Sequence, residues 1–362
     1  MRVLQNIGLY PSYLRRMDSL LGRNISYQNA IDIFLDDGFE STHILKGVLE
    51  DKHNFIITLG NSEFVQQLWA TKQGMPLKTA LSDILLAQLE HHRADVFYNL
   101  DPVRFDDRIL KRLPGCVKKS IAWCAAPTPH TRFQGYDLIV NNFPGILRRY
   151  EQLGCRTGFF FPAVAPQMKS AAEIVDRPID IIFIGGYSRH HMRRNQILDS
   201  VAKMYPTLHV QFNLDVGRLN RLAEQPLIRH LKLMSRHCRS SSISAVSAPP
   251  LFGRELIEAI GKSKIVLNAA VDMAGEERGN IRCFEALGCG ALLLSDNGTY
   301  PEGMEPDRTL VAYKDSTDAV KKASLLISDD FLRNNIASAG HKMISELYSK
   351  SRQMEAFLGL IS

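Results

Sequence analysis

The chain has 362 residues, enough for two domains of ordinary size, each with its own core. Its 45% hydrophobic and 23% charged residues are typical of a globular protein and exclude a disordered or fibrous one. The net charge of +6 comes from short, dispersed basic pairs without a long basic block, which argues against nucleic-acid binding. No apolar run reaches the roughly 18 residues of a membrane helix, and the first residues lack a signal-peptide pattern. We therefore expect a cytoplasmic protein.

Predicted strands and helices alternate through the first 160 residues. We expect helices at about 14–21, 27–37 and 77–92, and strands at 1–8, 55–59, 94–100, 120–124, 137–142 and 157–162. A further helix begins near Asn61 to Glu63, and its apolar spacing predicts a buried stripe of Phe64, Val65, Leu68 and Trp69. This alternation predicts a Rossmann-like, doubly wound domain over residues 1–163.

A proline-containing segment at 162–166 is the best candidate for a linker, and a second α/β alternation follows it over residues 176–340. The expected strands are 179–184, 208–212, 242–246, 265–268, 291–294 and 309–313. An amphipathic helical region covers about 329–358.

Two glutamates, Glu277 and Glu285, lie in the most informative stretch of the sequence, with seven residues between them. The pattern predicts a loop at 277–280, then a helix carrying Glu285, a glycine turn and a buried strand. A helix start favours an anion, so a phosphate there would be bracketed by two carboxylates that can accept hydrogen bonds from sugar hydroxyls. The alternative is a surface helix with two solvated acids.

A second anchor is the pair Gly185 and Gly186, which we expect directly after a buried strand. Glycine lets the backbone approach a ligand closely. Arg193 and Arg194 follow, and either could neutralise a diphosphate; the sequence does not say which. The alternative is an ordinary tight turn.

The motif around Glu285 resembles that of a known enzyme family. Residues 282–290 read RCFEALGCG, and the E-x7-E spacing is followed by G-x-x-P-E at 298–302. This combination resembles the nucleotide-sugar half of the retaining, group 1 GT-B glycosyltransferases, and most of all the spore-maturation (CgeB-like) ones. The resemblance implies two Rossmann-like domains facing each other across a cleft. It also implies a terminal helix, residues 341–362, that crosses back to the first domain.

The resemblance also implies roles for individual residues. Glu285 would bind the ribose hydroxyls of the nucleotide, and Glu277 would contact the transferred sugar. The family more often reads E-G-F-G at the first glutamate, whereas this chain reads E-R-G-N, and Glu276 is an adjacent competitor. The backbone of Gly279, Asn280 and Ile281 would contact phosphate. Arg282 would be either a third cation for the diphosphate or the partner of an acid.

The implied reaction moves a sugar from a nucleotide-diphosphate donor, of UDP or GDP type, to a glycan or lipid-linked acceptor with retention, in cell-surface polysaccharide synthesis. Arginines and the helix dipole can stabilise the leaving diphosphate without a metal, and no other cofactor is expected. Asp101 and His130, at predicted strand ends of the first domain, are the candidates for acid, base or orienting roles. The basic balance would also suit contact with an anionic membrane.

Six scattered cysteines include no C-x-x-C pair, and the adjacent histidine pairs do not share a helix face, so we expect no metal site. Two other readings stay open. One is an inverting GT-B transferase that uses a different activated sugar, with His130 or Asp101 as its base. The other is a degenerate GT-B module that binds without catalysing.

Overall fold

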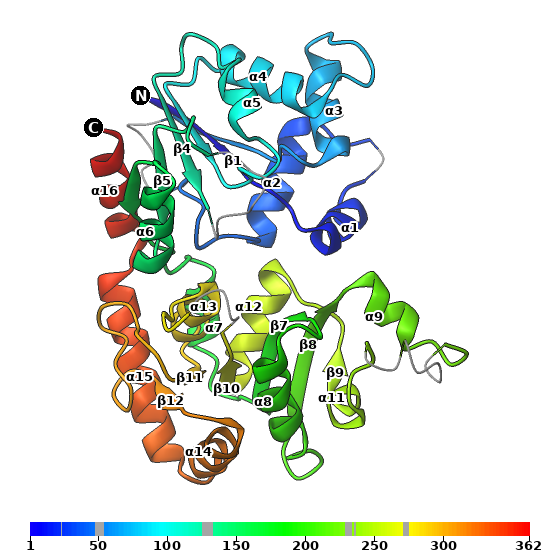
Figure 1. The fold of residues 1–362 in the computed structure, drawn as a ribbon, viewed down its shortest axis with the longest axis vertical. Coiled ribbons are helices and arrows are strands. Elements are labelled where there is room, and N and C mark those ends of the chain that lie inside the picture. Colours follow the sequence, from blue (N-terminus) through cyan, green and yellow to red (C-terminus); the bar gives the residue numbers. More distant parts are fainter. Residues whose placement is uncertain (23, 48–53, 125–132, 229–233, 235–236, 271–274) are drawn as a thin grey trace. The chain divides into compact units, whose positions relative to one another are not determined.

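The chain forms two compact units, and the second is inserted into the first (Figure 1). The computed structural model describes residues 1–22, 24–47, 54–124, 133–228, 234, 237–270 and 275–362. Unit 1 comprises Met1–Ala163 and Lys350–Ser362, and unit 2 comprises Val164–Ser349. Each unit is built on one six-stranded sheet in which all described pairings are parallel. The predicted α/β class is confirmed.

The sheet of unit 1 has the strand order β2-β1-β3-β4-β5-β6. Its strands are β1 (Arg2–Asn6), β2 (Asn54–Thr58), β3 (Val96–Asn99), β4 (Lys119–Trp123), β5 (Leu138–Asn141) and β6 (Thr157–Phe159). Its helices are α1 (Pro11–Leu20), α2 (Tyr27–Asp37), α3 (Glu63–Lys72), α4 (Leu81–His91), α5 (Asp107–Leu110), α6 (Pro144–Gln152) and α16 (Lys350–Ile361). The second and third strands flank the first on opposite sides, so the strand order reverses between β1 and β3.

Helix α16 follows unit 2 in sequence but belongs to the core of unit 1. Met354 and Phe357 are buried against the sheet, and the Phe357 ring lies 5.1 Å from that of Tyr98 and 5.8 Å from that of Phe160. The side-chain amine of Lys119 in β4 also donates to the carbonyl of Leu360, at 2.7 Å. One face of the first sheet is therefore completed only by the second segment of unit 1.

The main-chain carbonyl of Thr42 accepts hydrogen bonds from the end of the first segment of unit 1 and from the start of the second segment. The amide of Ala163 donates to it at 2.9 Å, Lys350 Nζ at 3.0 Å and Gln353 Nε2 at 2.8 Å. Lys350 Nζ also donates to the carbonyl of Ile44, at 2.9 Å. Burial lowers the pKa of Lys350 to about 7, because a dry site disfavours the ammonium form.

The sheet of unit 2 has the strand order β12-β11-β10-β7-β8-β9. Its strands are β7 (Ile179–Tyr187), β8 (Val210–Val216), β9 (Ser247–Ala248), β10 (Ser263–Asn268), β11 (Leu292–Asp296) and β12 (Val311–Tyr313). Its helices are α7 (Met168–Ala172), α8 (Met192–Ala202), α9 (Arg218–Ala223), α11 (Ser241–Ala245), α12 (Gly253–Gly261), α13 (Ile281–Gly288), α14 (Ser316–Ser328) and α15 (Asp330–Leu347). The first strand, β7, is central, and the order reverses between β7 and β10, which in open α/β sheets marks the ligand crevice at the carboxyl ends of the strands.

Apolar side chains on alternate positions of the β7 strand pack toward opposite faces. Ile181 and Phe183 join the core made with α8, α11 and α14, whereas the helices α7, α12 and α13 pack together as a second group (Figure 1). Both faces are thereby covered, which explains why these strands read as continuous apolar runs.

Several local predictions differ from the structure. The segment 242–246 lies almost wholly in helix α11, because the hydroxyl of Ser240 accepts the amide of Ile243 and starts a helix there. Phe64 is 40% exposed, and Gln66 takes the buried position instead. The strand predicted at 179–184 continues to Tyr187, since β8 is long enough to pair with it that far.

Candidate functional site

Gly185 and Gly186 lie inside strand β7 and not in a turn after it. They pair in register with Leu214 and Asp215 of β8. Gly186 is exposed, and a Cβ atom there would meet only the carbonyl oxygen of Asp215, at 3.9 Å. The backbone at Gly186 is thus open to close approach, beside the point where the strand order reverses.

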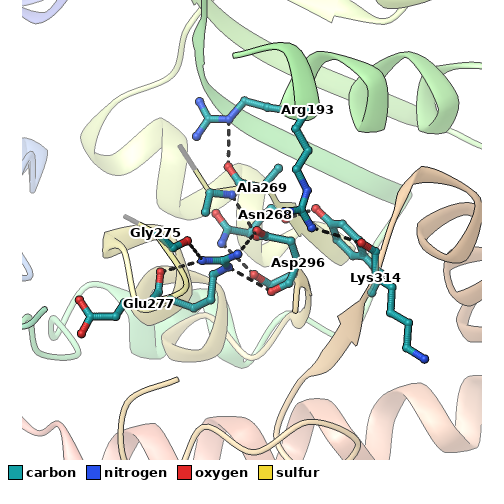
Figure 2. A network of polar contacts seen from close by, with 12 residues as sticks. Arg193, Asn268, Ala269, Gly275, Glu277, Asp296 and Lys314 are labelled. Atoms are coloured by element: carbon teal, nitrogen blue, oxygen red, sulfur yellow. Dashed lines mark hydrogen bonds and ion pairs between the residues drawn. The ribbon is translucent and has the colours of Figure 1, made fainter. Parts of the chain in front are cut away.

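Two arginines in the first turn of α8 bridge the ends of separate strands. Arg194 donates from Nε to the carbonyl of Ala269 at 2.9 Å and from Nη1 to that of Gly186 at 3.3 Å, and so joins β7 to β10. Arg193 is exposed, and its Nη2 donates to the carbonyl of Lys314, just after β12, at 3.2 Å. Figure 2 shows Arg193 extended toward Lys314, with Ala269 and Asn268 between the strand ends.

Asn268, the last residue of β10, is linked to Asn280, the residue before α13. Each side-chain amide donates to the other's carbonyl oxygen, at 3.0 and 3.1 Å. The side chain of Asn268 also donates to the hydroxyl of Ser295 in β11, at 3.0 Å. The main-chain carbonyl of Asn268 accepts a hydrogen bond from the hydroxyl of Tyr313 in β12, at 2.7 Å. The start of α13 is therefore fixed to three neighbouring strand ends.

Helix α13 begins as the sequence predicts, directly after the loop 277–280. Asn280 stands at the N-cap position, but its side chain makes no capping hydrogen bond because it is engaged with Asn268. Gly279 has φ of 119°, a conformation that side chains rarely adopt, so glycine is required there. The first turn of α13 thus presents its backbone without a side-chain cap, which is the arrangement that suits an anion.

Glu285 lies one turn into α13 and is paired with Arg282. Arg282 Nη1 is 2.5 Å from Glu285 Oε2, and the two side chains are 12% and 13% exposed. Burial raises the pKa of the Glu285 carboxyl, and the Arg282 guanidinium opposes that rise. The reading of Arg282 as the partner of an acid is the one that this geometry matches. The alternative of two solvated acids does not hold for Glu285.

Glu277 lies in a short ladder with the loop that follows β11. It forms a parallel bridge with Thr299: the amide of Arg278 donates to the Thr299 carbonyl at 2.7 Å, and the Thr299 amide to the Glu276 carbonyl at 2.8 Å. Figure 2 shows the carboxylate of Glu277 directed away from Asp296. Glu277 is half-buried and Glu276 is exposed.

Arg278 is 6% exposed and points into unit 2. Its Nη2 pairs with Asp296 Oδ2 at 2.8 Å, and Asp296 Oδ1 accepts the amide of Ala270 at 3.0 Å. Arg278, Asn268 and Asp296 were not singled out from the sequence. Asn268 and Asp296 are recognisable in the sequence as polar residues that end apolar strands, whereas nothing local to Arg278 indicates that it is buried.

Asp101 and His130, the candidates for acid, base or orienting roles, belong to unit 1. Asp101 follows β3, and its amide donates to the side chain of Asn99, which is itself bonded to Asn6 of β1 at 2.8 Å. Burial raises the pKa of Asp101, opposed by Arg104 at 3.4 Å. His130 lies outside the described residues.

Polar contacts at the carboxyl edge of the unit 2 sheet bring four predicted donor-side residues, Gly186, Arg193, Arg194 and Asn280, together with Asn268, Arg278 and Asp296. Arg282 and Glu285 pair with each other on the helix that Asn280 starts. Among the described residues, no three His, Cys, Asp or Glu side chains are grouped to hold a metal ion. In the same part of the chain, no helix has the length and apolarity needed to span a membrane.

Comparisons with known proteins find a matching family model over part of the chain and solved structures with a similar fold. Residues 219–359 match a family model described as glycosyl transferase-like. No curated protein matches the chain. Among solved structures, HepE from Anabaena in complex with UDP-glucose is similar over 99% of both chains, with a TM-score of 0.57 at 12% identity.

Two further solved structures resemble the chain over its whole length. A glycosyltransferase from Rickettsia africae has a TM-score of 0.54 at 11% identity, over 99% of this chain and 97% of its own. Sucrose-phosphate synthase from Thermosynechococcus elongatus has a TM-score of 0.54 at 11% identity, over 100% of this chain and 98% of its own. The chain has the GT-B fold, as the sequence resemblance implied.

Proposed function

We propose that this chain is a glycosyltransferase that moves a sugar from a nucleotide-diphosphate donor to an acceptor hydroxyl, on a glycan or a lipid-linked glycan. The observation that carries the proposal is the network at the carboxyl edge of unit 2, which joins the uncapped start of α13 to the ends of β7 and β10 and sets Glu285 on the same helix. The glycosyl transferase-like match over residues 219–359 includes α13, and HepE, a structural neighbour, binds UDP-glucose.

In the proposed donor site, Glu285 accepts hydrogen bonds from the ribose hydroxyls, and Arg282 orients its carboxylate. Backbone amides of Asn280 and Ile281 contact the diphosphate, with Gly279 providing the close approach. Glu277 contacts the transferred sugar. The donor is of UDP or GDP type.

The two arginines of α8 have different parts in this proposal. Arg194 already bonds two strand-end carbonyls, so it holds the site together. Arg193 is exposed and carries a single described hydrogen bond, which makes it the better cation for the leaving diphosphate. With the helix dipole, it supplies positive charge where negative charge develops, and we propose that no metal is needed.

We propose that the reaction retains the anomeric configuration. The second candidate function is an inverting transfer, which requires a base beside the acceptor hydroxyl. The observation that favours it is that burial raises the pKa of Asp101. The anomer of the product, determined by NMR, separates the two. An inverted product that is lost with Asp101→Asn would establish the second.

The first test is thermal unfolding with UDP, GDP, ADP, TDP and CMP and with their sugar conjugates. A ligand at 100 times its Kd adds about 2.7 kcal/mol of stability, which is a readable rise in Tm. We expect one nucleotide to raise the Tm of the wild type, and Glu285→Ala to abolish the rise measured against its own ligand-free protein. Glu346→Ala, which removes an exposed carboxylate on α15, is the control and should keep the rise. If no nucleotide stabilises the wild type, the transferase proposal fails and a binding module takes its place.

A further inference from the structure

A buried arginine, Arg278, directly follows the glutamate that is proposed to contact the sugar. Its guanidinium donates to three main-chain carbonyls besides pairing with the Asp296 carboxylate. Nη1 reaches the carbonyls of Gly275 and Glu277, both at 2.9 Å, and Nε reaches that of Asp296 at 3.3 Å. Figure 2 shows Gly275, Glu277 and Asp296 around this centre.

These bonds tie the loop before α13 to Asp296, the last residue of β11. The short ladder between Glu277 and Thr299 joins the same loop to the loop after β11. Gly298 permits the contact: a Cβ atom there would overlap the carbonyl oxygen of Glu276 and lie 2.9 Å from Arg278 Cγ. The hydroxyl of Tyr300 also donates to the Asp296 carbonyl, at 2.7 Å. The backbone at 276–278 is therefore held on two sides.

We propose that Arg278 is a positioning residue of the donor site, which holds Glu277 and the amides of Asn280 and Ile281 in their binding geometry before the nucleotide-sugar arrives. This inference rests on the proposed function and adds to it a residue that does not touch the donor.

Physical chemistry favours this role over a contribution to stability alone. Burying a guanidinium and a carboxylate costs desolvation free energy that their attraction often only offsets, so an apolar pair would stabilise the unit as well. The planar fork of arginine does what an apolar residue cannot do, because it holds carbonyls of the loop before α13 and of the end of β11 at defined angles. A loop ordered in advance loses less entropy when the ligand binds, and its amides are already aimed at the charge.

The test compares Arg278→Lys with the wild type by hydrogen exchange and by nucleotide affinity. Lysine keeps the charge but lacks the fork, so we expect faster exchange of the amides of residues 275–282 in the ligand-free protein. We also expect the Kd of UDP to rise about tenfold while that of UMP, held by Glu285 through the ribose, stays within about twofold. If the panel above selects guanine, GDP and GMP replace them.

Arg333→Lys is the matched control. Arg333 is also 6% exposed, pairs with Asp330 at 2.6 Å and donates to a main-chain carbonyl, that of Leu326. Arg333 lies near Arg177, a residue that precedes β7, at the opposite edge of the sheet. The Arg333→Lys substitution should lower Tm because it alters a buried arginine, but it should change neither hydrogen exchange at 275–282 nor the ratio of the UDP and UMP affinities.

A second variant covers the case in which Arg278→Lys does not fold. Asp296→Asn keeps the shape and one acceptor but removes the charge, and we expect the same changes at smaller size. Unchanged exchange at 275–282, or UDP and UMP affinities that fall by the same factor, would overturn the inference while leaving the proposed function intact. A wild type that binds none of the nucleotides would instead refute the proposed function, and the positioning role with it.

Discussion

The side-chain amides of Asn268 and Asn280 exchange two hydrogen bonds, at 3.0 and 3.1 Å, across the gap between strand β10 and helix α13. Asparagine is suited to this arrangement because it offers a donor and an acceptor on one planar group. The pair leaves the helix without a side-chain cap and fixes its first turn to the sheet instead. The position of the proposed phosphate contacts is thus set by strand β10.

Asn280→Ala should lower the free energy of unfolding of unit 2 by about 1–3 kcal/mol, because the buried amide of Asn268 loses a partner. Urea unfolding followed by circular dichroism measures this. Asn335→Ala, at an exposed position of α15, is the control and should change stability little. Equal effects of the two substitutions would show that the amide pair contributes nothing.

Gly298→Ala should destabilise unit 2 by about 1–3 kcal/mol, since the added methyl group overlaps the Glu276 carbonyl oxygen and has to displace one of the two loops. Gly115→Ala is the comparison: no atom lies within 4 Å of a Cβ there, so that variant should be as stable as the wild type or slightly more stable. The measurement is the midpoint of urea unfolding. A Gly298→Ala protein with the wild-type midpoint would contradict the close packing of Arg278 on this loop.

Lys350 should make the stability of unit 1 rise with pH between about 7 and 10. In the folded protein its pKa is lowered to about 7, whereas in the unfolded chain it stays near 10.4, so the unfolded state binds more protons across that window. The pKa of the nearby His43 is lowered to about 3, so this imidazole is neutral throughout.

Lys350→Met should therefore show a smaller increase of unfolding free energy from pH 7 to pH 10 than the wild type, measured by urea unfolding at each pH. Lys111→Met, at an exposed position, should keep the wild-type slope. The burial of the amine would be refuted if Lys350→Met and the wild type had the same slope.

Phe357→Ala should cost unit 1 about 3–5 kcal/mol, because it removes a fully buried ring from between Tyr98 and Phe160 and leaves a cavity. Glu355→Ala, at an exposed position of the same helix, should have little effect. Near-ultraviolet circular dichroism during urea unfolding reports on the aromatic side chains. A loss below about 1 kcal/mol would mean that α16 is not part of the core.

The parts of the fold that could be predicted are those specified by local pattern. Apolar runs marked the strands, and Ser62, whose hydroxyl accepts the amide of Val65, starts α3 where the sequence predicts. The segment 242–246 was wrongly predicted as a strand because its isoleucine and valine favour one, whereas the capping Ser240 starts a helix there. Gly185 and Gly186 were predicted to follow the strand because glycine is frequent in turns. They lie inside β7 because the partner strand β8 is long enough to pair with them.

The candidate site was predictable only where its residues follow one another in sequence. Glu277, the start of α13 and Glu285 lie within nine residues, so helical spacing relates them. Arg278 and Asp296 are 18 positions apart, and Arg194 meets Ala269 over a separation of 75. Contacts of that kind depend on which strands become neighbours in the sheet, and no periodicity in the sequence encodes that order.

The placement of α16 has a consequence for the order in which the units can form during synthesis. Unit 2 is encoded between the two segments of unit 1, so the ribosome completes it before Met354 and Phe357 exist. Domains generally fold as units, N-terminal first, while the chain emerges, whereas here we expect unit 2 to complete its fold before unit 1. The first 163 residues lack Met354 and Phe357 on one face of their sheet until a helix is made nearly 190 residues later. An expression fragment that ends at Ala163 would keep this face incomplete, and we expect it to aggregate unless α16 is supplied.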